Sequence, residues 1–347
     1  MAFDRLPTGS WILVTGATGL AGSAIVNLLL QRGFCVRGVG RSALKAALFT
    51  EHLKAKYGAG SFEFAEVADF TASDAFHSAL LGIVGIVHLA ADTNLDPNVE
   101  TEAALSAAAA AVLSLMRAAA DVVSVKSFVF TSTAAAVVAG AIEYGKDATF
   151  STATWQDQLI PLAKSLPTED PKRTVVLYGA TKVHAEREAW RFWNDTKPGY
   201  AFNTVVPVGI FGPVLNPTKG VVYSSHTWLN DLFLGNRESP IVNFLNPAVA
   251  MVDSRDCAAV HVAALLSSET NGQRLWASAH HFTANQILVI WRKAFPDRNI
   301  LSDFDFPPHP KIEFTDVHKS TKLLKEFAGK DWYTLEESIL ANVESVL

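Results

Sequence analysis

The feature that most constrains the fold of this chain is a glycine-rich turn at residues 15–22, with the sequence TGATGLAG. A short apolar run at 11–14 precedes the turn, and a run with helical character at 23–31 follows it. Strand, glycine turn and helix in this order are typical of the first unit of a dinucleotide-binding domain. Glycines at these positions allow a tight turn and bring backbone N–H groups close to a pyrophosphate. The turn alone is also compatible with a loop that binds nothing, so the rest of the chain must decide.

The composition indicates a compact soluble protein. Its 347 residues are 49% hydrophobic and 18% charged, enough for one large domain with an added lobe or for two domains. A net charge of −5 argues against nucleic acid or an anionic membrane as the main partner. The only two cysteines, Cys35 and Cys257, fit no metal-binding spacing and favour a reducing, cytoplasmic location. The N-terminus lacks the apolar core of a signal peptide. The alanine-rich run at 103–123 is interrupted by Arg117 and Asp121, so we expect a buried helix there and no membrane span.

Apolar strands alternate with helices through the first 210 residues. Strands are expected at 11–14, 35–40, 62–67, 85–90, 127–132 and 202–206, with helices at 23–31, 43–57, 74–81, 101–120 and 178–194. Nearly continuous apolar strands joined by helices predict a parallel sheet covered on both faces. We therefore predict an α/β protein with a Rossmann-type doubly wound sheet at 1–210, to which a strand and helix at 249–266 return. The remaining segments, 211–248 and 267–347, are predicted to form a smaller C-terminal substrate-binding lobe.

Tyr178 and Lys182 form the second informative pattern. A spacing of four residues places both side chains on one helix face, one turn apart. A nearby ammonium group stabilises phenolate and lowers the pKa of the tyrosine, which a phenol needs in order to donate a proton near neutral pH. In isolation the pair could belong to an ordinary surface helix. Here it follows a nucleotide-type turn and a strand that ends in Thr-Ser-Thr at 131–133, which makes the pattern more specific.

Taken together, these features resemble the extended short-chain dehydrogenases/reductases, a family with a glycine-rich turn, a strand-end Ser or Thr and Tyr-x-x-x-Lys in that order. The resemblance covers most of the chain. It is narrower to the dihydroflavonol-reductase-like branch, which includes fungal and yeast NADPH-dependent aldehyde and ketone reductases. The segments that carry this narrower resemblance are 36–42, 124–129 and 178–190.

The resemblance implies a role for each residue of the Tyr-Lys pattern. Tyr178 would protonate the carbonyl oxygen as hydride arrives from the nicotinamide. Lys182 would lower the pKa of that tyrosine and hydrogen-bond the nicotinamide ribose. Thr133 is expected to polarise the carbonyl oxygen, with the neighbouring Ser132 as the alternative third hydroxyl.

The second strand bears on the choice of cofactor. NAD-binding folds tend to end this strand with an acid that bonds the ribose 2′-hydroxyl, whereas an arginine there accommodates a 2′-phosphate. Residues 36–47 contain no Asp or Glu but include Arg41 and Lys45, so we predict NADPH/NADP+ as the cofactor. The resemblance adds Asp69 as a partner of the adenine amino group. Further cofactor contacts are expected from the turn, from the fourth strand end and from the strand after the catalytic helix, together with Tyr178 and Lys182: Thr15, Gly16, Thr18, Gly19, Leu20, Gly22, Ala90, Ala91, Pro207, Val208 and Gly209.

The leading hypothesis is an NADPH-dependent carbonyl reductase that converts a small ketone or aldehyde into a stereodefined alcohol. Two related enzyme classes share the triad, the NAD(P)-dependent sugar-nucleotide epimerases or dehydratases and the 3β-hydroxysteroid dehydrogenases. The missing acid after the second strand argues against the epimerases. A non-enzymatic NADP-sensing regulator is disfavoured because both Tyr and Lys are present. We expect a monomer or homodimer without a metal. Candidate substrate contacts are Thr93, Phe211, His226 and Trp228.

Overall fold

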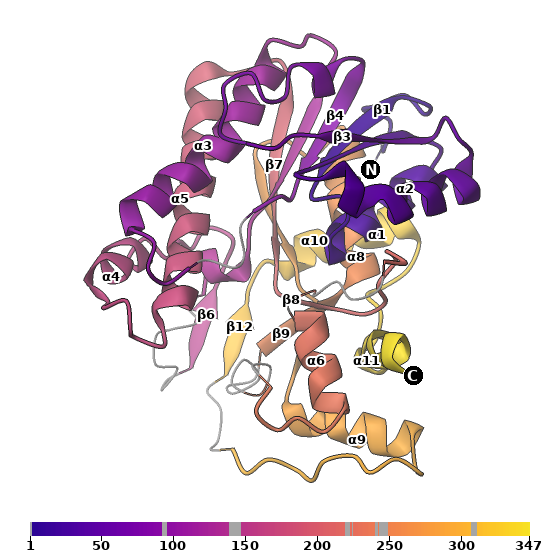
Figure 1. The fold of residues 1–347 in the computed structure, drawn as a ribbon, viewed down its shortest axis with the longest axis vertical. Coiled ribbons are helices and arrows are strands. Elements are labelled where there is room, and N and C mark those ends of the chain that lie inside the picture. The colour runs from indigo at the N-terminus through magenta and orange to yellow at the C-terminus, as the bar shows by residue number, and fades with distance from the viewer. Residues whose placement is uncertain are drawn as a thin grey trace.

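A parallel seven-stranded sheet lies at the centre of the protein (Figure 1). The computed structural model describes residues 2–91, 96–138, 147–218, 223, 225–239, 242, 249–306 and 311–347. The strand order is β3-β2-β1-β4-β5-β7-β10, and it changes direction between β1 and β4, which is where open parallel sheets bind their ligands. The strands are β1 (Trp11–Thr15), β2 (Cys35–Gly40), β3 (Phe62–Glu66), β4 (Ile83–His88), β5 (Ser127–Thr131), β7 (Ala201–Pro207) and β10 (Gln273–Ala277).

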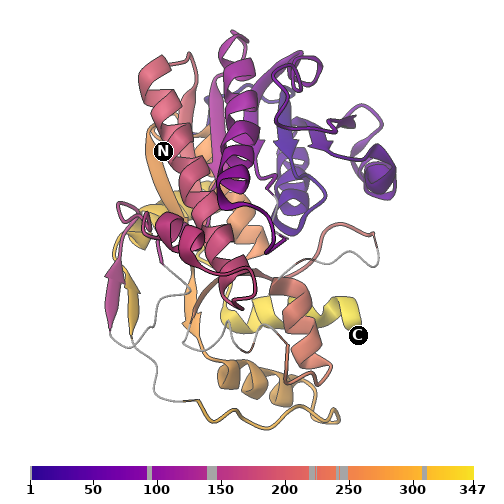
Figure 2. The ribbon, with the colours of Figure 1, turned by 60° about the vertical axis from the view of Figure 1, so that its left-hand side comes forward.

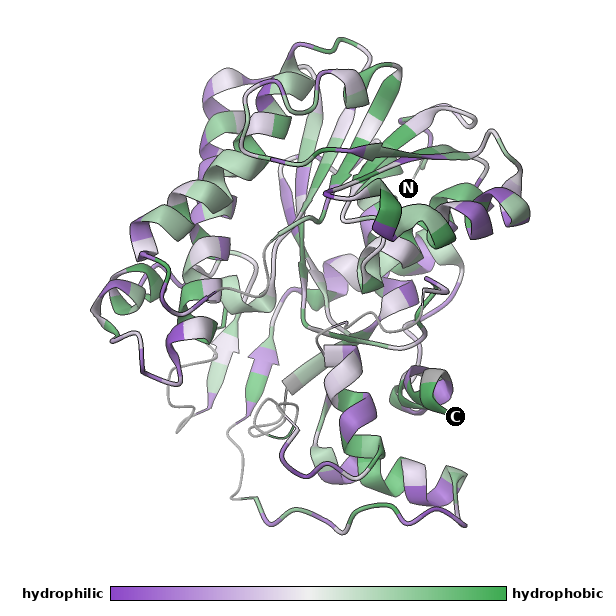
Figure 3. Ribbon diagram, viewed as in Figure 1, coloured by the Kyte–Doolittle hydropathy of each residue, from purple (hydrophilic) through white to green (hydrophobic). Residues whose placement is uncertain are grey.

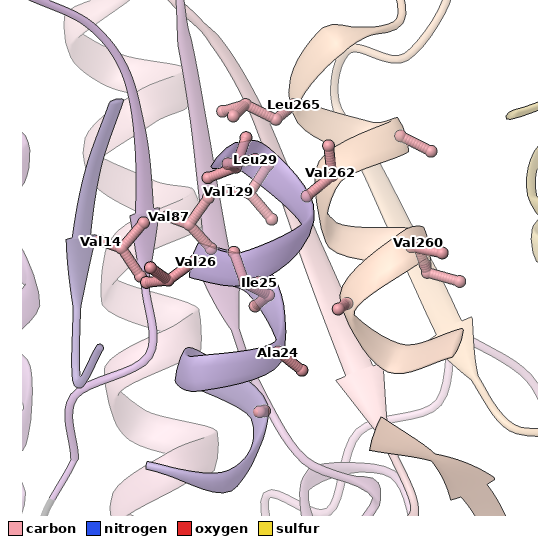
Figure 4. Close-up of a cluster of buried hydrophobic side chains, with 14 of the residues drawn as sticks. Val14, Ala24, Ile25, Val26, Leu29, Val87, Val129, Val260, Val262 and Leu265 are labelled. Carbon is pink, nitrogen blue, oxygen red and sulfur yellow. The ribbon is translucent and has the colours of Figure 1, made fainter. Parts of the chain in front are cut away.

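Helices cover both faces of this sheet. One face carries α1 (Leu20–Gln31), α2 (Ala43–Tyr57), α8 (Ser254–Leu266) and α10 (Val317–Ala328). The other carries α3 (Thr101–Ala120) and α5 (Arg173–Thr196). Alternate residues of β1 supply the two cores, since Ile12 and Val14 belong to the first and Leu13 to the second. Figure 4 shows the first core, where valines and leucines of α1 and α8 meet strand valines such as Val14, Val87 and Val129. The predicted doubly wound sheet is confirmed.

The central strands are mainly hydrophobic, as Figure 3 shows, because both of their faces are covered. Helices α3 and α5 lie side by side along one face of the sheet (Figure 2). By length and composition alone α3 could cross a membrane, yet 56% of its apolar stretch is buried inside the fold. This packing agrees with the buried helix expected for the alanine-rich run.

A second, smaller core lies below the carboxyl edge of the main sheet in Figure 1. Its sheet pairs β8 (Gly209–Phe211) in parallel with β9 (Val249–Asp253), which pairs antiparallel with β11 (His280–Phe282). Around it pack α6 (Ser225–Phe233), α9 (Ala284–Ala294) and α11 (Leu335–Val343). The remaining elements are the parallel pair β6 (Ala148–Phe150) and β12 (Ile312–Phe314), helix α4 (Leu159–Ser165) and the 3-10 turns Ser78–Leu80, Ala134–Ala136 and Glu344–Val346.

The structure corrects several of the predicted segments. The strand expected to return to the nucleotide domain, β9, pairs with β8 and β11 instead. Residues 273–277, assigned to the lobe, form the edge strand β10 of the main sheet, and α10 packs against α8 and β10. An edge strand has one unpaired side and tolerates polar residues, so its sequence, QRLWA, lacks the apolar run that marked the other strands. The helix predicted at 74–81 is reduced to a 3-10 turn, and α5 begins at Arg173, ahead of the predicted start at 178.

Candidate active site

The glycine-rich turn has the geometry that a dinucleotide pyrophosphate requires. Gly16 has a positive φ of 65°, and a Cβ atom there would lie 3.2 Å from the backbone nitrogen of Ala90. A Cβ atom on Gly22 would collide with the carbonyl oxygen of Gly16, so only glycine lets α1 lie this close to the turn. Gly19 is the N-cap residue of α1 and has no side chain that could cap the helix. The first N–H groups of the helix therefore face the turn. The predicted contacts Thr18 and Leu20 flank Gly19. These residues fit an anionic cofactor.

Thr15 and His88 connect the ends of β1 and β4. The Thr15 hydroxyl oxygen accepts hydrogen bonds from the backbone N–H groups of Leu89 and Ala90, at 3.1 and 3.0 Å. It therefore donates its own proton to Nδ1 of His88, 2.8 Å away. Burial lowers the pKa of His88 to about 3, so this histidine is neutral, as expected for a core residue. The Thr15 side chain thus holds the chain after β4 in place, and its contact with the cofactor stays a prediction.

Three consecutive residues at the end of β5 each bond to a different turn of α5. Lys182 donates from Nζ to the carbonyl oxygen of Thr131 at 3.2 Å. Ser132 donates from Oγ to Oε2 of Glu186 at 2.5 Å. The Thr133 hydroxyl forms a hydrogen bond with the Tyr178 hydroxyl. Positions 178, 182 and 186 share one helix face because each step of four residues is about one turn.

This arrangement brings the predicted triad together and distinguishes its two candidate hydroxyls. Thr133 is partly buried and forms a hydrogen bond with Tyr178. Ser132 is buried, and its hydroxyl donates a hydrogen bond to Glu186. In extended backbone, successive side chains point in opposite directions. Ser132 and Thr133 therefore have different partners although they are adjacent in sequence. The structure therefore favours Thr133 over Ser132 as the third hydroxyl of the site.

Burial controls the protonation of the pair on α5. It lowers the pKa of Lys182 to about 8, and the nearby Glu186 carboxylate opposes part of this fall. Burial also raises the pKa of Tyr178, while the hydrogen bond with Thr133 works in the opposite direction. The sequence argument predicted that Lys182 lowers the pKa of the phenol. In the structure the ammonium group is bonded to a backbone carbonyl and desolvation of Tyr178 dominates, so the direction is reversed.

The predicted 2′-phosphate site lies at the end of β2. Arg41 and Lys45 have exposed side chains there, on either side of the start of α2. Sequence reasoning missed Glu66, because this acid comes from the neighbouring strand β3 and not from the 36–47 segment. Its Oε2 atom accepts a hydrogen bond from the backbone N–H of Ala43 at 2.7 Å. An acid from β3 is thus bonded to the first residue of the helix that follows Arg41 and carries Lys45.

The remaining predicted cofactor contacts also lie at the carboxyl ends of strands. Asp69 follows β3 and is exposed, and its Oδ1 atom accepts two hydrogen bonds from Thr71, which lower the pKa of the aspartate. Pro207 ends β7, Gly209 begins β8, and Val208 between them bonds to the last residue of β10. Ala91 is exposed and follows the end of β4. Their roles toward the cofactor stay predictions.

Asn216 is a residue that the sequence analysis did not single out. Its side-chain Nδ2 donates to the carbonyl oxygen of Thr18 at 2.8 Å, and its Oδ1 accepts from the backbone N–H of Thr218 at 3.0 Å. The chain after β8 is thereby joined to the glycine-rich turn, 198 residues away in sequence. A lone asparagine in a loop carries no sequence pattern that would have revealed this contact.

The four candidate substrate contacts have different environments. Phe211 is fully buried and packs edge-on against Phe282, so it has no exposed surface for a substrate and the prediction is wrong for this residue. His226 is buried on α6, and its Nε2 atom has no hydrogen-bond partner among the described residues. Trp228 is partly buried on the same helix. Thr93 lies outside the described residues.

Fold and site together define an enzyme of the short-chain dehydrogenase/reductase type, with a dinucleotide turn and a Thr-Tyr-Lys cluster at the carboxyl edge of one sheet. The chain belongs to the NAD dependent epimerase/dehydratase family, whose sequence profile matches residues 12–276. It is 32% identical to aldehyde reductase 2 of Sporidiobolus salmonicolor over 96% of this chain and 95% of that protein. It is also 32% identical to the ketoreductase adrE of Penicillium rubens, over 96% of each chain. Among solved structures, yeast methylglyoxal/isovaleraldehyde reductase Gre2 complexed with NADPH superposes with a TM-score of 0.77 at 28% identity, covering 97% of this chain and 98% of that one.

Proposed function

We propose that this protein is an NADPH-dependent carbonyl reductase that converts a ketone or an aldehyde into a stereodefined alcohol. The observation that carries the proposal is the cluster of Thr133, Tyr178 and Lys182 beside a turn that fits a pyrophosphate. The relatives named above are an aldehyde reductase, a ketoreductase and a methylglyoxal/isovaleraldehyde reductase, which supports the same reaction type here.

Each residue of the cluster has its own part in this proposal. The bound cofactor would supply a hydride to the carbonyl carbon. Tyr178 donates its phenolic proton to the carbonyl oxygen, and the Thr133 hydroxyl holds the same oxygen by a hydrogen bond. The Lys182 ammonium lies one helical turn away and favours the phenolate that remains until solvent returns the proton. Burial keeps the phenol protonated before the transfer, because it raises the pKa of Tyr178. Two hydroxyls that hold one oxygen fix the carbonyl beside the hydride donor, and discrimination between its two substituents would then make the alcohol stereodefined.

The preference for NADPH rests on the two cations at the start of α2. Arg41 and Lys45 are exposed and lie where the ribose 2′-phosphate is held in folds of this type. The neighbouring Glu66 carboxylate is bonded to the N-terminus of α2 and does not form an ion pair with either cation among the described contacts. The NADPH bound in the yeast relative supports the same choice.

A substrate panel tests the proposed function. Purified protein is mixed with NADPH or NADH and with aldehydes, simple ketones and keto esters, and loss of nicotinamide absorbance is followed together with chiral analysis of the alcohol. We expect faster turnover with NADPH and a single stereoisomer of the alcohol. No consumption of either cofactor across the panel would contradict the assignment.

Location and assembly are proposals of the same kind. We propose a cytoplasmic protein that is a monomer or a homodimer. Both cysteines are free thiols and Cys257 is fully buried, which suits a reducing compartment. Fluorescent tagging in the source cell and light scattering on the purified protein test the two statements.

A further inference from the structure

Glu186 is a fully buried carboxylate directly behind the proposed catalytic cluster. It lies one turn after Lys182 on α5, and its Oε2 atom accepts a hydrogen bond from Oγ of Ser132 at 2.5 Å. Arg274 of β10 donates to both carboxylate oxygens, from Nη2 to Oε2 at 2.8 Å and from Nε to Oε1 at 2.9 Å. Trp190 adds a longer bond to Oε1 at 3.4 Å. The sheet end, the catalytic helix and the edge strand thus converge on one carboxylate.

Arg274 is itself held in place on several sides. Its Nη1 atom donates to the carbonyl oxygens of Thr152 and Thr154, at 2.8 and 2.7 Å. The guanidinium lies over the ring of Trp155, 3.8 Å from its centroid. Only 7% of the Arg274 side chain is exposed. A planar guanidinium bonded in this way leaves the Glu186 carboxylate little freedom to rotate.

We propose that Glu186, held by Arg274, is a positioning residue for carbonyl reduction. Through Ser132 it fixes the end of β5, so that the hydroxyl of the next residue, Thr133, meets Tyr178, and it places a negative charge beside Lys182. The inference rests on the proposed function, because the reaction is what this positioning would serve.

The charges around Lys182 support this role. Glu186 opposes the fall in the pKa of Lys182 that burial causes. His88 of β4 also faces the ammonium, and His261 of α8 bonds to the Thr131 hydroxyl at 2.9 Å. Burial lowers the pKa of these two histidines to about 3 and about 4, so neither carries charge near neutral pH. Tyr178 is neutral as well, since burial raises its pKa.

Packing alone does not require an ion pair at this position. Buried ion pairs are often replaceable by apolar residues of similar volume without loss of stability. A charged pair that also anchors the residue before Thr133 and lies one turn from Lys182 is therefore better explained by the reaction than by stability.

The first experiment is Glu186→Gln in the full-length enzyme, with kcat and KM measured from pH 6 to 10. The amide keeps the volume and one acceptor for Ser132 but removes the charge. We expect kcat to fall by about 10- to 100-fold through misplacement of Thr133, with KM for NADPH changed by less than about threefold. Loss of the carboxylate lowers the pKa of Lys182, so the ammonium is lost at lower pH. The alkaline limb of the kcat profile should therefore move down by about one pH unit.

Glu188→Gln is the matched control. Glu188 lies on the same helix and pairs with Arg191; the two side chains are 16% and 68% exposed, so the same substitution removes an ion pair outside the catalytic cluster. We expect kcat and the alkaline limb of this variant to match the wild-type enzyme.

Ser132→Ala separates the two roles of Glu186. It also tests the positioning role if the Glu186→Gln protein does not fold. It removes the bond to the strand end but keeps the Glu186–Arg274 pair, so kcat should fall while the alkaline limb stays in place. Unchanged kcat in both variants of an active enzyme would overturn the positioning role. A loss in Ser132→Ala as large as that in Tyr178→Phe would also overturn it, because Ser132 would then be the catalytic hydroxyl. If the wild-type protein shows no turnover, the proposed function is contradicted instead. The dissociation constant of NADPH, measured in the same variants at increasing pH, would then report on the protonation of Lys182.

Discussion

Replacing Arg274 with methionine should be one of the most destabilising single changes in the nucleotide domain. The substitution keeps an unbranched side chain that can pack on Trp155 but removes both bonds to Glu186. It leaves a fully buried carboxylate with Ser132 and Trp190 as its partners. Breaking a buried ion pair from one side costs about 3–5 kcal/mol, compared with about 0–1 kcal/mol for an exposed pair.

Thermal unfolding measures this loss. A change of about 3–5 kcal/mol corresponds to a fall in Tm of roughly 4–7 °C in a chain of 347 residues, whose unfolding entropy is about 0.7 kcal/mol/K. The double variant Arg274→Met with Glu186→Leu should recover much of the stability, since no unpaired charge remains.

The control for this prediction is Arg187→Met, which lies on the same helix as Glu186 and breaks an exposed pair with Asp157; the two side chains are 44% and 55% exposed. We expect its Tm to stay within about 2 °C of the wild-type value. If Arg274→Met lowered Tm no more than Arg187→Met, the argument that the buried pair is tightly coupled would be refuted. Failure of the double variant to regain stability would show that Arg274 acts mainly through its bonds to Thr152 and Thr154.

Three further predictions concern the cofactor site. Arg41→Ala should raise KM for NADPH by about 10-fold or more and KM for NADH by less than about twofold, as one lost charge-assisted contact to phosphate implies; equal effects on both would contradict the 2′-phosphate assignment. Gly22→Ala should destabilise the fold by about 2 kcal/mol or more through overpacking, measured by denaturant unfolding; Gly60→Ala, with open space around its Cβ position, is the control and should change little. Asn216→Ala should weaken NADPH binding by about 5-fold, since it removes a bond worth about 1 kcal/mol between the lobe and the glycine turn; calorimetric titration checks this, and an unchanged affinity would show that the link is independent of the cofactor.

Much of the central sheet and part of the site follow from local sequence patterns. The bounds of β2, α2 and α3 match the prediction because each is a long, strongly patterned segment between clear breakers. The glycine-rich turn and the Tyr178–Lys182 spacing are also local, so both are readable from the chain. The edge strand β10 was missed because it begins with two polar residues and has only three apolar ones, and β9 was misplaced because a short apolar strand does not reveal its partner.

The rest of the site depends on contacts that no local pattern contains. Ser132 and Thr133 are adjacent and chemically alike, and only their partners on α5 distinguish them. Glu186 gains its importance from Arg274, 88 residues further along the chain. Glu66 reaches the start of α2 from a neighbouring strand. The predicted direction of the Tyr178 pKa shift was wrong. Sequence spacing places Lys182 nearby, but it does not show that Tyr178 is buried or that Lys182 is bonded to Thr131.

The most direct test of the account is Tyr178→Phe, measured for NADPH binding and for NADPH oxidation with the best substrate of the panel. The change removes one hydroxyl and leaves the ring, so we expect an NADPH dissociation constant within about threefold of the wild-type value and a kcat lower by about 10³-fold, because the proton donor is gone. Tyr57→Phe, which removes a hydroxyl bonded to Asn27 at the far end of α2, is the matched control and should retain full turnover. A Tyr178→Phe enzyme that still oxidises NADPH at near the wild-type rate would contradict the central claim that this phenol protonates the carbonyl oxygen.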